Sequence, residues 1–432
     1  MKNKLLLIAL AISLFTNAQN TINQVFILNE GYFDYTANQL ISPATLGSYN
    51  PSTQAYSVVD TLDGARFASD MIINNNNLYV AADNKLYKYD KNTYSLLATQ
   101  QVDGIRNLAV WNDKIIVTRG DYDNVTFAPI LFNSYLQVYN TSDLSLHTEI
   151  DTVSGPKWST QNVIVEGDNA YIAVNNAYEW GNYKGIVGVL DLTNFNYGNE
   201  INLDSNGINP DNMVYSNGYI YTVNNKDFSG SSVSKIDLST NQLSSTVDIA
   251  TANTGCGTSS LKDDKLIYQL SQETTLNEFD INLMNNIGPL SNFNVNYYCL
   301  SQNPVNGNLY TSNTDFASYG KVYIYNTNNI EISNFDVGIS PGNIRFDVVS
   351  SAGINETSNE ISFYPNPSNK QLNLSSEFNG TIEVINLLGK KIMTLDAKNL
   401  TEINISNLKN GKYMLKFIKE NELKSFKSFV KI

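Results

Sequence analysis

The sequence predicts an all-β fold: a seven-bladed β-propeller followed by a small C-terminal β-sandwich. Short alternating apolar runs separated by Asn, Asp and Gly turns replace helical periodicity almost throughout. A strand-and-turn marker recurs seven times, and the two ends of the repeated region complement each other. A plain β-sandwich with a similar number of strands would explain neither the count of seven nor the complementary ends.

The first marker is a short strand followed by Asp or Asn and a polar turn. Its seven copies are centred on Asn50, Asp90, Asn140, Asp191, Asp237, Asp280 and Asn326, with spacings of 40, 50, 51, 46, 43 and 46 residues. These spacings are typical of four-stranded propeller blades. The Asp or Asn side chain can accept a hydrogen bond from the backbone two residues later, which tightens the turn between the two outer strands.

A second marker, a short apolar strand, precedes each copy of the first and predicts the second strand of each blade. Its copies cover residues 25–31, 76–81, 113–118, 169–174, 218–223, 264–270 and 307–312. The first copy has no room for an inner strand before it, whereas the last copy is followed by an extra strand at 342–350. We therefore expect the two ends of residues 20–350 to complete one blade together, which leaves no open sheet edge.

Residues 1–18, MKNKLLLIALAISLFTNA, predict a secretory signal peptide. They contain two lysines, an apolar segment and a small-residue cleavage site after Ala18. The segment has no Cys for a lipid anchor, and no later segment approaches eighteen consecutive apolar residues. The expected mature protein is exported and is not a transmembrane protein.

The charge distribution predicts a domain boundary near the C-terminus. The net charge is −13, but residues 19–360 hold 15 basic and 35 acidic residues, whereas residues 361–432 hold 11 lysines and 6 acids. The small, polar segment 351–360 is the predicted linker. An acidic main body argues against a nucleic-acid partner, because phosphate binding needs a basic surface.

The C-terminal region, residues 361–432, carries four ordered motifs. They are FYPNP at 363–367, NLLGK at 386–390, LKNGKY at 408–413 and a final Lys431-Ile432. This region resembles the type A C-terminal sorting domain of the type IX secretion system of Bacteroidota. The resemblance implies handling by the type IX machinery, passage through the outer membrane, and release or attachment at the cell surface.

The predicted ligand-binding face is the one that bears the longer loops. All four arginines and most large aromatic residues of the loops map to it. The candidate ligand-binding residues are Tyr32, Phe33, Arg66, Arg106, Arg119, Tyr122, Trp158, Tyr178, Trp180, Tyr183, Phe228, Phe316, Tyr319 and Arg345. Arginine and aromatic groups together suit a ligand with a flat apolar surface and anionic or amide groups. Alternatively, the arginines pair with aspartates and hold the loops together, and the rings only pack the loops. The aspartates of this alternative are Asp63, Asp103, Asp121 and Asp123.

Catalysis has little support in the sequence. The single histidine, His147, lies on a predicted outer strand, which argues against Ser-His-Asp chemistry and His-based zinc sites. No metal and no cofactor is predicted. Acidic residues are present in the loops but match no calcium-loop spacing. An extracellular lyase or lactonase-type hydrolase remains the alternative to a non-enzymatic protein.

The two cysteines, Cys256 and Cys299, are predicted to occupy matching positions on adjacent inner strands. Each lies ten residues before an equivalent leucine, Leu266 or Leu309. A disulfide between them is one prediction. Two buried free thiols are the favoured alternative, because positions related by rotation need not point at each other.

The N-terminal strand resembles a known family. VFILNEG at 25–31, followed by LGSYN at 46–50, is similar to the YncE-like surface propellers of Bacteroidota. Some members bind vitamin B12 and related corrinoids and pass them to an outer-membrane transporter. The known corrinoid binders look like lipoproteins, whereas this chain carries a sorting tail.

We therefore expect a secreted or cell-surface, non-enzymatic binding propeller. The resemblance implies a corrinoid or another nutrient as its ligand and an outer-membrane transporter as a candidate partner. An adhesion or structural surface protein that contacts proteins or glycans is the alternative. The sequence does not identify the ligand.

Overall fold

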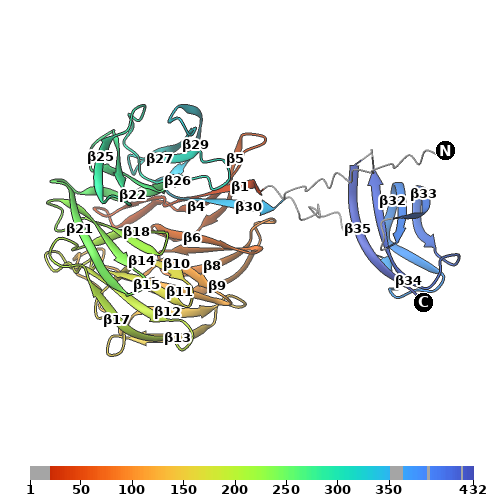
Figure 1. The fold of residues 1–432 in the computed structure, drawn as a ribbon, viewed down its shortest axis with the longest axis horizontal. Helices are drawn as coiled ribbons and strands as arrows, with labels where there is room; N and C mark the ends of the chain where they lie inside the picture. Colours follow the sequence, from red (N-terminus) through yellow and green to blue (C-terminus); the bar gives the residue numbers. More distant parts are fainter. Residues whose placement is uncertain (1–19, 351–362, 387–389, 420–421) are drawn as a thin grey trace, which may run out of the picture. The chain divides into compact units, whose positions relative to one another are not determined.

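Strands are the only regular elements in the described chain (Figure 1). The computed structural model describes residues 20–350, 363–386, 390–419 and 422–432. Two compact units contain them, Asn20–Val349 and a second unit that begins at Ser350. The predicted signal peptide and linker lie outside the described residues. Within those residues, no helix has the length and apolar character needed to cross a membrane.

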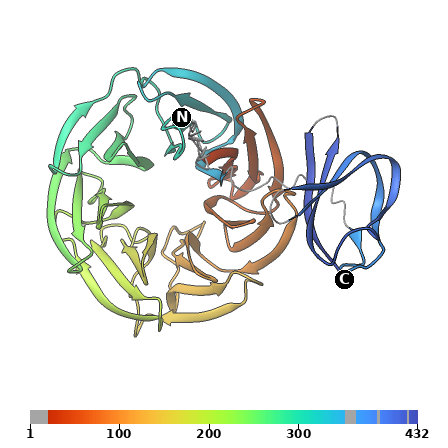
Figure 2. The same cartoon turned by 45° about the vertical axis from the view of Figure 1, so that its right-hand side comes forward.

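The first unit is a β-propeller built from four-stranded sheets, which follow one another around a central axis (Figure 2). Its first four sheets, each from the inner to the outer strand, are β30 (Pro341–Ser350), β1 (Asn20–Asn29), β4 (Ala44–Asn50), β5 (Ala55–Leu62); β6 (Ala68–Asn74), β7 (Asn77–Ala82), β8 (Lys85–Asp90), β9 (Leu96–Gln101); β10 (Ile105–Trp111), β11 (Lys114–Arg119), β12 (Ser134–Asn140), β13 (Leu146–Asp151); and β14 (Thr160–Glu166), β15 (Asn169–Val174), β16 (Ile186–Asp191), β17 (Asn196–Asn202).

Three further four-stranded sheets continue the series. They are β18 (Pro210–Ser216), β19 (Tyr219–Asn224), β20 (Ser231–Asp237), β21 (Gln242–Ala250); β22 (Thr254–Lys262), β23 (Lys265–Leu270), β24 (Leu276–Asp280), β25 (Asn285–Pro289); and β26 (Leu300–Gln302), β27 (Leu309–Asn313), β28 (Tyr319–Tyr325), β29 (Glu331–Ile339). A separate hairpin, β2 (Tyr32–Asp34) with β3 (Gln39–Ser42), forms within the first long loop.

The closing sheet joins the two ends of the propeller chain. Its order is β30-β1-β4-β5, so the last strand lies on the inner side of the first. This is the arrangement predicted from the missing first strand and the surplus last strand. Pairing the ends removes the two free edges that an open ring would expose.

The recurrent Asp and Asn residues shape the turns between the two outer strands, as their side chains predict. The side-chain oxygens of Asn50, Asp90, Asp191, Asp237, Asp280 and Asn326 each accept a hydrogen bond from the backbone N–H two residues later. Asn140 differs, because Asp143 accepts the bond from Ser145 in that turn. The shared turn explains why the repeat is visible in the sequence.

The core lies between neighbouring sheets. Second strands are buried on both faces, as Ile115, Ile116 and Val117 of β11 illustrate. One cluster packs Phe26 of β1 against Met71 of β6, and equivalent clusters join each sheet to the next. Burial between flat sheet faces therefore holds the ring together and leaves the inner strands free to present polar side chains.

The second unit is an all-β domain with its own core. Its strands are β31 (Phe363–Tyr364), β32 (Gln371–Asn386), β33 (Lys391–Asn404), β34 (Gly411–Lys419) and β35 (Glu422–Lys431). They form one five-stranded sheet, in which the long β32 pairs with β31, β33 and β34. Leu372, Val384, Phe417 and Phe429 are among its buried residues.

Candidate functional site

The inner strands lose their regular pairing near their first residues. The pairing register shifts between Ala68 and Asp70 in β6, and the same irregularity recurs in β10, β14, β18 and β22. A bulge of this kind leaves residues unpaired and turns their side chains. In this propeller the irregular segments lie where polar side chains line a central cavity.

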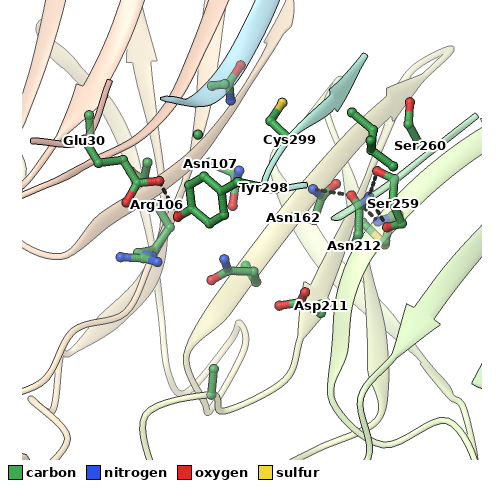
Figure 3. A pocket seen from close by; sticks show the side chains of 18 of the residues that line it. Glu30, Arg106, Asn107, Asn162, Asp211, Asn212, Ser259, Ser260, Tyr298 and Cys299 are labelled. Carbon is green, nitrogen blue, oxygen red and sulfur yellow. Dashed lines mark hydrogen bonds between the residues drawn. The ribbon is translucent and has the colours of Figure 1, made fainter. Parts of the chain in front are cut away.

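That central cavity has a volume of about 580 Å³ and is lined by inner-strand residues of all seven four-stranded sheets. The volume lies within the range of small-molecule sites. Its amide and hydroxyl residues are Ser69, Asn107, Gln161, Asn162, Asn209, Asn212, Ser259, Ser260, Tyr298, Ser301 and Asn343. Figure 3 shows several of them directed at the open space.

Five acidic or amide residues, here called the Asx ring, occupy the same place on five inner strands. They are Asp70, Asn107, Asn162, Asn212 and Asn343, and each directly precedes a buried or largely buried apolar residue. Asp70 accepts hydrogen bonds from Asn343 Nδ2 and from the backbone N–H of Leu108, both at 2.9 Å. Asn162 donates to Asn212, which in turn donates to Ser259 Oγ at 2.8 Å. The ring therefore links neighbouring sheets around the axis.

Some acceptors in the cavity wall are left without a partner. Oδ1 of Asn107, Oδ1 of Asn343 and Oε1 of Gln161 are buried and accept no hydrogen bond within the protein. Buried polar atoms are normally paired, because leaving them unpaired costs free energy. These three oxygens are places where donor groups of water or of a ligand would bind.

Arg106 is the arginine of the cavity lining that forms no ion pair within the described residues. Its guanidinium carbon lies 5.3 Å from the ring centroid of Phe67 and 5.3 Å from that of Tyr178. Its Nε is buried and has no hydrogen-bond partner, and no carboxylate of the described residues forms an ion pair with it. Two aromatic rings thus hold the cation while its in-plane donors stay unused.

The other predicted arginines are used within the protein. Arg66 pairs with Asp83 and, at 3.2 Å, with Asp121. Arg345 also lines the cavity, but its Nη2 lies 2.9 Å from Asp70 Oδ1. Both side chains pair with aspartates, as the alternative expected, but Asp121 is the only one of the four expected aspartates among these partners.

Arg119 is buried at the end of β11. Its Nε donates to the carbonyl of Asp103 at 2.8 Å and its Nη1 donates to the carbonyl of Ser134 at 2.7 Å. Its guanidinium lies 4.3 Å from the Phe132 ring centroid. Burial lowers the pKa of Arg119 from its ordinary value. These contacts fix the loop that follows β11 and leave Arg119 away from the cavity.

Glu30, the first residue after β1, lies beside Arg106 at the mouth of the cavity (Figure 3). Tyr298 Oη donates to Glu30 Oε1 at 2.6 Å. Burial raises the pKa of Glu30 to about 7, although the Tyr298 hydrogen bond and the Arg106 charge act in the opposite direction. A Cβ at Gly342 would lie 2.1 Å from Oε1, so a larger residue there would displace the Glu30 carboxyl. The site therefore contains a carboxyl group that titrates near neutral pH.

A first row of rings runs along the rim of the loop-bearing face. Tyr122 lies 6.1 Å from Tyr35 and 5.8 Å from Tyr178, between ring centroids. Phe33 of β2 meets Tyr35 edge-on at 4.9 Å. Tyr32 lies on the same short strand and, like Phe33, is outside the cavity lining. These rings pack the loops and support Tyr178, which does line the cavity.

A second group of rings consists of Trp180, Tyr183 and Phe228, here called the rim platform. Trp180 and Phe228 stack with centroids 5.7 Å apart and an interplanar angle of 3°. Tyr183 meets Trp180 and Phe228 edge-on at 6.0 and 5.6 Å. Phe228 also lines the cavity, so the platform is continuous with it.

The remaining predicted aromatic residues are scattered. Trp158 lines a smaller cavity of about 210 Å³ together with Tyr178, and Lys184 Nζ lies 4.9 Å from its ring centroid. Phe316 meets Tyr298 edge-on at 5.1 Å. Tyr319, the first residue of β28, is 80% exposed.

Of the fourteen predicted residues, the structure brings Arg106, Tyr178, Phe228 and Arg345 to the central cavity. Sequence reasoning missed the Asx ring, Phe67 and Tyr298. One signal for the ring was present, since Asp or Asn followed by an apolar residue recurs near the start of the inner strands. No comparable sequence signal marks Phe67 or Tyr298. Their places in the cavity wall are recognisable only from the residues that the fold brings to them, Arg106 for Phe67 and Glu30 for Tyr298.

The predicted equivalence of the two cysteines is wrong. Ser259 pairs with Tyr268 and Leu300 pairs with Thr311, so the position that matches Cys299 is Thr258 rather than Cys256. The turn between β26 and β27 is longer than the turn between β22 and β23, so counting ten residues back from Leu266 and from Leu309 does not reach equivalent positions. Cys299 is a buried free thiol, and burial raises its pKa to about 11. The side chain of Cys256 lies outside the described part of the structure.

His147 lies on β13, an outer strand as predicted, and meets the Phe195 ring edge-on at 4.9 Å. No group of three or more His, Cys, Asp or Glu side chains in the described part of the chain is arranged to hold a metal ion. Besides amides and hydroxyls, the cavity lining carries the ionisable groups of Glu30, Arg106, Asp211, Cys299 and Arg345.

Comparison with known proteins identifies the C-terminal unit. Residues 362–431 match the family of secretion system C-terminal sorting domains. The chain is therefore exported through the type IX secretion system to the cell surface or the extracellular space, as the tail motifs predicted. No curated protein matches the chain.

Solved structures resemble the fold. The dihydro-heme d1 dehydrogenase NirN, in complex with DHE, is 12% identical with a TM-score of 0.50 over 89% of this chain and 76% of that chain. Hydrazine synthase of Kuenenia stuttgartiensis is 13% identical, with a TM-score of 0.48 over 62% and 85% of the two chains. BamB of Moraxella catarrhalis is 10% identical, with a TM-score of 0.44 over 76% and 87%. At these identities the likeness concerns the fold alone.

Proposed function

We propose that this protein is an exported, non-enzymatic binding propeller that holds the anionic group of a small ligand at Arg106. The observation that carries the proposal is the unpaired guanidinium between Phe67 and Tyr178. A cation that forms no ion pair within the described residues has its unused donors available to a carboxylate or phosphate.

The shape and polarity of the cavity favour a small ligand over an adhesion partner. A volume of about 580 Å³ suits a small molecule, whereas adhesion needs a broad surface. The unpaired oxygens of the wall suit ligand amides or hydroxyls. Corrinoids carry amides and a phosphate. We therefore include them among the candidate ligands on the basis of the resemblance to YncE-like propellers, with an outer-membrane transporter as the proposed partner that would receive them.

The test is a ligand screen on the purified chain by isothermal titration calorimetry. The panel contains cobalamin, cobinamide, uronic acids, amino acids and phosphate esters. Arg106→Ala should weaken binding of the ligand that is found by about 2–3 kcal/mol. The matched control is Lys235→Ala, which removes a cation 4.0 Å from the Tyr219 ring centroid on β20, away from the cavity lining. Equal binding by wild type and Arg106→Ala would refute the proposal.

A second candidate function, a proton-transfer enzyme, is favoured by Glu30. A carboxyl group whose pKa is about 7 can accept a proton near neutral pH, and Arg106 lies beside it to stabilise negative charge that develops on a substrate. This arrangement suits a lyase or lactonase-type hydrolase. Glu30→Gln should then abolish turnover and keep substrate binding, whereas absence of turnover of every bound ligand by the wild type would exclude it.

A further inference from the structure

The rim platform presents a tryptophan face to the solvent. Trp180 is 81% exposed, whereas the other two tryptophans, Trp111 and Trp158, are only partly exposed. Its orientation is fixed by parallel stacking on Phe228 and by the edge of Tyr183. A large flat ring that is both exposed and held in place is suited to stack against a flat apolar surface of a ligand.

The backbone under the platform is anchored. Phe228 has a φ of 66°, a left-handed conformation that is uncommon for a bulky residue. Its N–H donates to the carbonyl of Asn225 at 2.8 Å. Asn225 is itself buried, and its Oδ1 accepts hydrogen bonds from the N–H and the hydroxyl of Thr254 at 2.9 and 2.8 Å. The fold thus holds the Phe228 ring in place at some cost in backbone energy.

A ligand that contacts both the rim platform and the cavity needs a flat apolar face for the platform and polar groups for the cavity wall. Phe228 belongs to both, and Arg106 lines the same cavity. The cavity wall offers amides and hydroxyls, including buried acceptors on Asn107 and Gln161 that need donor groups. The platform offers flat apolar faces. A saccharide meets both demands, because its hydroxyls donate and accept hydrogen bonds while the C–H face of its ring packs on an aromatic side chain.

We propose that the ligand is an acidic saccharide chain, with a sugar carboxylate bound by Arg106 and a following sugar ring stacked on Trp180. This inference rests on the proposed function, because it uses Arg106 as the anion site. A protein partner fits less well, since the platform is three rings beside a polar cavity rather than a broad apolar surface.

The experiment compares three probes by isothermal titration calorimetry at constant ionic strength: galacturonic acid, its α-1,4-linked trimer, and the neutral trimer maltotriose. The acidic trimer should bind the purified chain about tenfold more tightly than the acidic monomer, because stacking adds a contact. Trp180→Ala should remove this gain and leave monomer binding unchanged. Tyr319→Ala is the matched control, since Tyr319 is equally exposed but does not line the cavity.

Each outcome separates the two proposals. If the acidic monomer and the acidic trimer bind equally, the inferred stacking on Trp180 is wrong. It is also wrong if Trp180→Ala still binds the trimer more tightly than the monomer by the same factor. If maltotriose binds as tightly as the acidic trimer, the acidic class is wrong. If no saccharide binds but another anion does so through Arg106, the saccharide inference fails and the proposed function stands. If no ligand depends on Arg106, both fail.

Discussion

Two regions of the propeller differ in whether their charged side chains form ion pairs. One is the closing seam, made by Gln24, Lys91 and Asp347, and the other is the mouth of the cavity around Arg106. In the seam, Lys91 Nζ lies 2.5 Å from Asp347 Oδ1, and Gln24 donates to both Asp347 and the carbonyl of Lys91. At the mouth, Arg106 has ring contacts but no carboxylate partner. Paired charge in the seam ties the last strand to its neighbours, whereas unpaired charge at the mouth is available to a ligand.

The same contrast appears over a few ångströms at the mouth. Arg66 and Arg106 lie 5.4 and 5.3 Å from the centroid of the same Phe67 ring. Arg66 is paired with Asp83 and Asp121, and Arg106 is not. The ring contact is common to both, so the carboxylate partner is what distinguishes a structural arginine from a candidate binding arginine.

The largest effect on stability is expected from Asp347→Ala. The Asp347 side chain is fully buried, and its removal leaves the Lys91 ammonium in the seam without a counter-charge. Breaking a buried pair in this way costs about 3–5 kcal/mol of unfolding free energy. Denaturant titration measures the loss. Ligand affinity of the folded fraction should be unchanged.

The control for the seam is Asp336→Ala, which removes an ion pair with Lys321 whose aspartate is 82% exposed. Exposed pairs contribute little, so its loss should be much smaller. Equal losses in the two variants would show that burial of the seam pair has no special role.

The next effect is on binding. Arg106→Ala should weaken binding of an anionic ligand by about 2–3 kcal/mol, because a charge-assisted contact is lost in a partly desolvated cavity. Stability should change by only about 1 kcal/mol, since ring contacts alone are removed. Calorimetric titration and thermal unfolding measure both. A large loss of stability with unchanged ligand affinity would show that Arg106 has a structural role, like the residues of the seam, and not a binding role.

A third, smaller effect is the pH dependence of binding. The pKa of Glu30 is about 7, so this carboxyl is neutral at lower pH and negative at higher pH. An anion at Arg106 should therefore bind roughly tenfold more tightly at pH 6 than at pH 8. The same group favours the folded state most at acid pH, and this contribution is lost as the pH rises through about 7. Glu30→Gln should flatten the binding profile, and a profile unchanged in that variant would assign the titration elsewhere.

The smallest effect is expected at the outer turns, away from both regions. Asp90 accepts hydrogen bonds from the N–H groups of Asn92 and Thr93 at 2.9 and 2.8 Å, and the Thr93 bond is the main cause of its lowered pKa. Asp90→Ala should cost about 1 kcal/mol of unfolding free energy. Asp90→Asn should retain most of this stability, since Asn50 makes the same turn with an amide oxygen as the acceptor. Equal losses in the two variants would argue against the side-chain acceptor as the cause.

Much of the fold was readable from the sequence, because its signals are local. A residue such as Asp90 shapes its own turn through a bond to Asn92, two positions away, so the repeat appears as a spacing. The closing sheet was also predictable, since β1 lacked an inner strand and residues 342–350 were in surplus. The predicted equivalence of Cys256 and Cys299 failed because the turn between β26 and β27 is longer than the turn between β22 and β23. No local sequence signal indicates this difference in turn length.

The site was readable only in part. Loop placement selected Arg106 and Tyr178, which line the central cavity, but the same reasoning gave equal weight to Arg119, which binds backbone carbonyls. Whether an arginine is paired depends on which carboxylate the fold brings to it. Asp121, which pairs with Arg66, is 55 residues away in the chain.

The sequence by itself determined the propeller repeat, the joining of its ends and the sorting tail, because turn chemistry, strand alternation and terminal motifs act between residues close in the chain. Tertiary structure alone decided which charges are paired. Lys91 meets Asp347 across 256 residues and Tyr298 meets Glu30 across 268. Arg106 packs between two rings and has Glu30 beside it, but no carboxylate of the described residues comes within ion-pair distance of it.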